Sequence, residues 1–95
     1  MSNHIILVGT NGGCNPDKQQ VKKGAGTVEW ESESDKPCTI VFRGPSPFTQ
    51  SNFNVPAKGK SERAQQGVNV AEGLYKYDVN VQGGPSGDPM IEIIP

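Results

Sequence analysis

The sequence lacks several features that define large classes of proteins. Among its 95 residues are only two leucines, four alanines and one histidine, and the longest apolar run covers residues 5–8. Leucine and alanine are the best apolar helix formers, so their scarcity argues against a helical bundle. A run of four apolar residues is far shorter than the roughly 20 that cross a bilayer as a helix. We therefore expect no transmembrane helix.

An excess of charge of one sign is also missing. Nine Lys and Arg oppose ten Asp and Glu, which gives a formal net charge of −1. Proteins that bind nucleic acid or anionic membranes usually carry a basic patch, so neither partner is expected. The N-terminus has no basic segment followed by a long apolar one, as a secretory signal would. This favours a cytoplasmic location, or a periplasmic or secreted one if a signal has been removed.

The residues that are abundant are typical of β proteins. Val and Ile together number 15, and the chain contains 12 Gly and 8 Pro. β-Branched side chains suit pleated strands, whereas Gly and Pro suit the tight turns between them. A chain of this length organises one hydrophobic core. The composition therefore predicts a single all-β domain over residues 1–95.

Alternation of apolar and polar residues predicts seven or eight short strands. The clearest alternating segments are residues 27–32 and 74–81. Other strands are expected near residues 4–8, 19–23, 38–42, 48–55, 68–70 and 90–94, with a loop or single helical turn over 57–67. The residues expected in the core are Val8, Val28, Trp30, Ile40, Phe42, Tyr75, Tyr77, Val79, Ile91 and Ile93. Short strands separated by turn signals predict a two-sheet antiparallel sandwich.

Three passages, taken in order, resemble the cupredoxins, the plastocyanin- and azurin-like sandwiches. The first is Pro16 followed by residues 21–30, which include Val-Lys-Lys-Gly and Thr-Val-Glu-Trp. The second is Pro-Cys-Thr-Ile-Val-Phe at residues 37–42, and the third is Gly-Leu-Tyr-Lys-Tyr-Asp-Val at residues 73–79. The resemblance implies a cupredoxin-like Greek-key β-sandwich over the whole chain.

The same resemblance argues against a copper centre. Blue-copper sites use two histidines, one cysteine and a weak axial ligand, usually methionine. The resemblance assigns the first histidine position to Cys38 and the cysteine position to Val79, with Gln82 and Gly87 near the other two. None of these residues is the expected ligand, and a valine cannot donate a thiolate. We therefore expect no cofactor and a copper site that has been lost.

Two cysteines are the strongest candidates for other chemistry. The resemblance implies that Cys14 and Cys38 approach each other, which leaves open two buried thiols, a disulfide, or a copper or zinc site. His4, the single histidine, is a further candidate ligand in the last case. Any catalytic Ser-His or Cys-His pair would also have to use His4, and no second catalytic signal accompanies it. The protein is therefore expected not to be an enzyme.

Loops rich in proline supply a candidate docking surface. The resemblance implies that residues 44–48 and 83–89 lie at the same end of the sandwich, with Cys38 between them. The residues expected to contact a protein partner there are Cys38, Pro45, Pro47, Phe48 and Pro85. The alternative role for Phe48 is to fill the core. The function expected from these observations is that of a small binding or accessory module, whose partner and oligomeric state the sequence leaves open.

Overall fold

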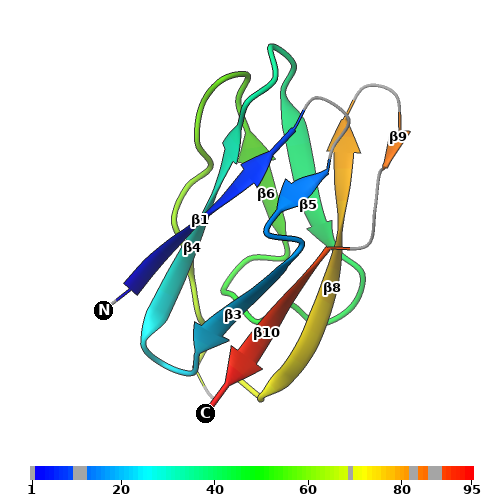
Figure 1. Cartoon of the computed structure of the whole chain (residues 1–95). Coiled ribbons are helices and arrows are strands. Elements are labelled where there is room, and N and C mark those ends of the chain that lie inside the picture. The colour runs from blue at the N-terminus through cyan, green and yellow to red at the C-terminus, as the bar shows by residue number, and fades with distance from the viewer. Residues whose placement is uncertain (1, 10–12, 69, 82–83, 86–88) are drawn as a thin grey trace.

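A computed structural model of the chain describes residues 2–9, 13–68, 70–81, 84–85 and 89–95, with the side chains of 2, 84 and 85 excluded. The described residues form two sheets joined by turns and short loops (Figure 1). They contain no helix, and so none that is long and apolar enough to cross a membrane. The all-β architecture with two sheets is as the composition predicts.

The first sheet combines parallel and antiparallel pairs. In spatial order it contains β2 (Cys14–Asn15), β1 (Ser2–Val8), β4 (Gly26–Ser32) and β7 (Ala64–Gln65). β1 and β4 run parallel, with Ile6 opposite Trp30, and the other two pairs are antiparallel. β4 buries every second residue, because alternate side chains of a strand point to opposite faces of its sheet.

The second sheet contains the remaining strands. Its spatial order is β3 (Lys18–Lys22), β10 (Met90–Ile94), β8 (Gly73–Val81), β5 (Cys38–Phe42) and β6 (Asn52–Val55), and β9 (Gly84–Pro85) pairs with β8. β3 and β10 run parallel, and all other pairs in this sheet are antiparallel. The chain therefore passes from the first sheet to the second between β2 and β3.

Three details of the predicted strands are wrong. The described residues form ten strands rather than seven or eight, because β2, β7 and β9 are two-residue strands too short to leave an alternating pattern. The sandwich is not antiparallel throughout, since β1–β4 and β3–β10 are parallel pairs. Alternation records which face of a strand is buried, and it carries no information on strand direction. No strand forms around Val68 and Val70: the first lies in a turn, and the short strand is Ala64–Gln65 instead.

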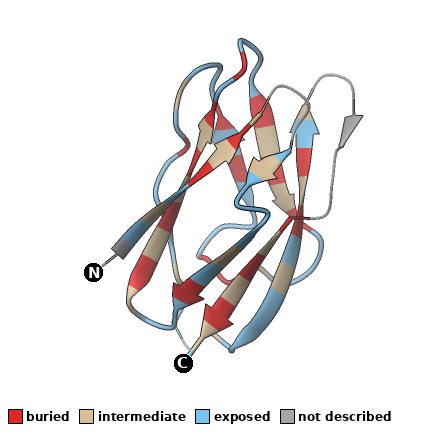
Figure 2. Ribbon diagram, in the orientation of Figure 1, coloured by how far each residue is buried: buried red, intermediate tan, exposed pale blue. Residues whose placement is uncertain are grey.

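Buried residues recur along the strands of both sheets (Figure 2). The core that they form is centred on Trp30. Four aromatic rings surround the indole with centroid separations of 5.1 to 6.3 Å; they belong to Phe42, Phe48, Phe53 and Tyr77. All predicted core residues are buried except Tyr75, which is half-buried. The Tyr75 hydroxyl donates to the Ala71 carbonyl at the surface, so this ring edges the core rather than filling it.

Candidate functional site

Both cysteines lie at one end of the sandwich. β2 places Cys14 opposite Val8 at the end of β1, and β5 begins at Cys38, opposite Val81 at the end of β8. The loop between β4 and β5 joins the sheets at this end, where Glu33 N donates to Val8 O at 2.9 Å. We call this region the Cys38 end. Neither cysteine is in a disulfide, so both are thiols.

A chain of polar groups connects the core to Cys14. Trp30 Nε1 donates a hydrogen bond to Tyr77 Oη at 3.2 Å inside the core. The side chains of Tyr77 and Cys14 also interact, and this interaction lowers the pKa of Cys14. Cys14 itself is half-buried and packs against the core cluster. The indole N–H and the phenol, which would each be costly to bury alone, therefore satisfy one another.

The environment of these groups keeps them protonated. Burial raises the pKa of Cys14 to about 11, and the hydrogen bond from Tyr77 offsets only part of that effect. Negative charge on Cys38 and on Asp17 raises the Cys14 pKa further. Burial likewise raises the pKa values of Cys38 and Tyr77. Thiolates are the reactive and metal-binding form of cysteine, so neither residue is primed for nucleophilic chemistry near pH 7.

The side chains at the implied copper positions do not fit copper. Val79 is fully buried beside Ile40 on the neighbouring strand, and Cys38, two residues from Ile40 on β5, is 4% exposed. Cys38 and Val79 are thus diagonal neighbours on the inward face of one sheet. Only one of these two side chains carries a donor atom, and Gln82 and Gly87 lie outside the described residues. These two positions therefore supply a single side-chain ligand atom, the sulfur of Cys38, and do not form a blue-copper site.

His4 does not join the two thiols. It lies four residues before Val8 on β1, so about 13 Å of strand separates it from the Cys38 end. Its Nδ1 is 3.2 Å from the side-chain nitrogen of Gln19. In the described part of the chain, no group of three or more His, Cys, Asp or Glu residues is placed to hold a metal ion.

The predicted docking residues do not form one surface. β5 runs from Cys38 to Phe42, so the following loop, with Pro45 and Pro47, lies at the opposite end of the sandwich, which we call the Phe42 end. The end of β8 at Val81 lies beside Cys38 instead, because β8 and β5 pair antiparallel. The backbone of Pro85 pairs with β8, and its side chain lies outside the description.

Burial separates the docking candidates further. Phe48 is 5% exposed and packs edge-on against Trp30. Its ring therefore fills the core, which was the alternative to partner docking. Pro47 and Cys38 are buried as well, whereas Pro45 is exposed. Of the four candidates whose side chains are described, only Pro45 is therefore freely available to a partner.

The Phe42 end carries a groove that the sequence did not predict. The groove measures about 340 Å³, and its walls include Pro45, Pro47, Val68, Val70, Ala71 and Tyr75. Val68 is 93% exposed, the most of any large apolar side chain among the described residues. The sequence predicts a short strand at Val68 and Val70 instead. The adjoining Gly67 was the available sign of a turn.

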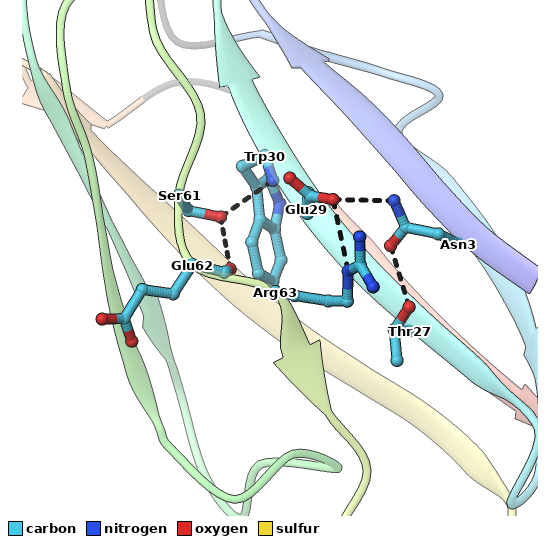
Figure 3. A network of polar contacts seen from close by, with 7 residues as sticks. All are labelled: Asn3, Thr27, Glu29, Trp30, Ser61, Glu62 and Arg63. Atoms are coloured by element: carbon cyan, nitrogen blue, oxygen red, sulfur yellow. Dashed lines mark hydrogen bonds and ion pairs between the residues drawn. The ribbon is translucent and has the colours of Figure 1, made fainter.

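A second group of polar contacts lies on the outer face of the first sheet (Figure 3). Asn3 Nδ2 donates to Glu29 Oε1 at 2.7 Å, and Thr27 Oγ1 donates to Asn3 Oδ1 at 2.8 Å. Arg63 Nε lies 3.5 Å from the same Glu29 oxygen. These contacts link β1, β4 and the segment before β7. Because these side chains bond to one another, we interpret the network as one that stabilises the first sheet.

The described residues form a small two-sheet all-β protein, with both thiols at the Cys38 end and an apolar groove at the Phe42 end. No protein-family model matches the chain, and the comparison with curated proteins returns no relative. Its chemistry must therefore be argued from its own residues.

Proposed function

We propose that this protein is a non-enzymatic binding module built on a cupredoxin-like Greek-key sandwich whose copper position is filled by side chains. The passages that carry the resemblance form β3 and β4, β5, and β8. Complete burial of Val79 beside Ile40 supports the loss of the metal, because an interior packed to normal density leaves no room for an ion. A cytoplasmic location remains a prediction from the sequence.

The groove at the Phe42 end is the observation that carries the binding role. An apolar side chain as exposed as Val68 stabilises a complex by roughly 1.5–3 kcal/mol when a partner covers it fully. Pro45, one of the predicted docking residues, also lines this groove. The docking surface that we propose is therefore at the Phe42 end.

The walls of this groove are fixed before a partner arrives. Gly67 N donates to Pro47 O at 3.1 Å, which ties the Val68 turn to the proline loop. The side chain of Gln66 accepts from Gly24 N at 2.8 Å and donates to Gly26 O at 2.8 Å. A preformed surface loses little conformational entropy on binding. The partner that fits is a protein segment that inserts one apolar side chain between Pro45 and Val68.

Selection from a random peptide library displayed on phage tests this function. Peptides selected on the wild-type protein are expected to share an apolar anchor and to shift the NMR signals of Gly67, Val68 and Tyr75. Val68→Asp is expected to weaken them at least tenfold, or about 1.4 kcal/mol. The matched control is Leu74→Asp, which changes an exposed apolar residue outside the groove. Peptides that bind Val68→Asp and Leu74→Asp equally well would refute the groove as the binding site.

A second candidate function is binding of a soft metal ion, copper or zinc, by Cys14 and Cys38. The observation in its favour is that both cysteines are free thiols at the same end of the sandwich, and negative charge on Cys38 raises the pKa of Cys14. Thiolate ligands favour Cu(I) and zinc. Titration of the reduced protein with Cu(I) and Zn(II) is expected, under this candidate, to saturate at one equivalent and release protons. Cys38→Ser would abolish that binding, and titrations alike for both proteins would rule the candidate out.

A further inference from the structure

The outer edge of β6 presents unpaired main-chain groups. Phe42 N donates to Ser51 O at 3.0 Å, so these two residues form a directly hydrogen-bonded pair of the β5–β6 ladder. Direct and non-bonded pairs alternate along an antiparallel ladder. The backbone groups of Phe53 therefore face β5, whereas those of Asn52 and Asn54 point away from it. Within the described residues, no strand lies on that outer side.

A cleft of about 270 Å³ lies along this edge. One wall is β6 with Asn52, Phe53 and Asn54, and the other is formed by Lys60 and Glu62. Phe53 is 4% exposed, so its ring lies under the cleft as part of the core.

The far wall is held firmly in place. Lys60 forms an antiparallel bridge with Glu31 of β4. The next residue, Ser61, donates from its backbone to Trp30 O at 2.8 Å, and its hydroxyl accepts from Trp30 N at 3.0 Å (Figure 3). The wall is thus anchored to the backbone of the central core residue, and the cleft does not depend on a mobile segment.

The polar side chains along the cleft have no partners within the described part of the chain. Gln50, Asn52, Asn54, Lys60 and Glu62 all line it, and none makes a side-chain hydrogen bond or ion pair there. Lys60 and Glu62 are two residues apart, which is about 7 Å in an extended chain. The cleft therefore offers main-chain groups on one wall and a positive charge followed by a negative one on the other.

We propose that this cleft binds an extended peptide segment of another protein, which adds to β6 as an extra strand. The ligand carries an acidic residue facing Lys60 and, two residues away, a basic residue facing Glu62. Main-chain hydrogen bonds supply affinity in strand addition, and side chains at alternate positions supply specificity. The outward-facing backbone amides of Asn52 and Asn54 are two residues apart, which is the spacing at which an added strand forms its hydrogen bonds. The site is separate from the groove that carries the proposed function.

A charge swap tests the side-chain part of this proposal. Phage-displayed nine-residue peptides would be selected on the wild-type protein, and in parallel on Lys60→Glu combined with Glu62→Lys. The double variant keeps the net charge and exchanges the two charges of the wall. Wild-type selections are expected to contain an acidic and a basic residue two positions apart, and the variant should select the reverse order. Identical selections, or none in this cleft, would overturn the proposal.

Backbone methylation tests the strand addition itself. In a selected peptide, N-methylation of the amides that face β6 is expected to reduce affinity at least tenfold, whereas methylation of the alternate amides should have little effect. Asn54→Pro removes one outward N–H of β6 and should weaken the unmethylated peptide, since proline is tolerated at such edge positions. Equal tolerance of both methylation patterns would refute strand addition. Val68→Asp should bind these peptides normally, so failure of the groove and failure of this cleft are distinguishable.

Discussion

At the scale of single residues, the Tyr77 hydroxyl is the most consequential polar group of the core. It accepts from Trp30 Nε1 and contacts Cys14 while the residue is fully buried. Tyr77→Phe leaves the indole N–H unsatisfied, so we expect it to lower the free energy of unfolding by about 1–3 kcal/mol in urea titrations. The control is Tyr75→Phe, which removes a hydroxyl at the surface. Equal losses for the two variants would mean that the buried hydrogen bond contributes no more to stability than the surface hydrogen bond of Tyr75.

The thiol of Cys14 should make stability depend on alkaline pH. Its pKa is about 11 in the folded protein and 9.0 in an unfolded chain. Because the folded state holds the proton more tightly, this contribution is complete below pH 9 and is lost as the pH rises towards 11. A pKa raised to this extent corresponds to a loss of roughly 2–3 kcal/mol at most.

Urea unfolding at pH 8 and at pH 10.5 measures that loss. Cys14→Ala is expected to show a smaller decrease between the two pH values than the wild-type protein does. The remaining decrease would come from Tyr77 and Cys38, whose pKa values are also raised by burial. If the two proteins lose stability in parallel, Cys14 does not hold its proton in the folded state.

At the scale of elements, the two sheets are in contact where β3 and β4 meet. A Cβ atom on Gly26 would lie 2.6 Å from Val21 Cγ1 and 3.5 Å from His4 Nε2. Gly26→Ala must therefore displace a fully buried valine, and we expect a loss of about 1–3 kcal/mol in urea unfolding. Gly44→Ala is the matched control, because nothing lies within 4 Å of its Cβ position. A neutral Gly26→Ala would show that this corner can expand.

Strand faces could be predicted from the sequence, because burial of one face imposes a period of two. β4 and β8 follow that period, and Val28, Trp30, Tyr77 and Val79 are all buried as expected. Strand direction and pairing could not be predicted in this way. The β1–β4 and β3–β10 pairs are parallel because of the path that the chain takes between the sheets, and no local pattern records that path.

At the scale of the whole molecule, the candidate sites depend on which strand ends share an end of the sandwich. β2 and β5 place Cys14 and Cys38 at the same end of the sandwich. The loop containing Pro45 was expected at the same end, but one strand length separates it from Cys38. The groove beside Val68 and the cleft along β6 each combine segments that are distant in sequence. Such sites follow from packing, so the order of residues alone did not reveal them.

The central claim is that the sandwich has lost the copper site of the family it resembles. Titration of the reduced protein with Cu(II), followed by visible absorbance, tests it most directly. An intense blue band requires a cysteine thiolate bound to copper together with histidine ligands. Val79 occupies the implied cysteine position, and His4 is distant from Cys38. We expect no intense blue absorbance at any copper ratio. A saturable blue band at one equivalent, lost in Cys38→Ser, would contradict the claim.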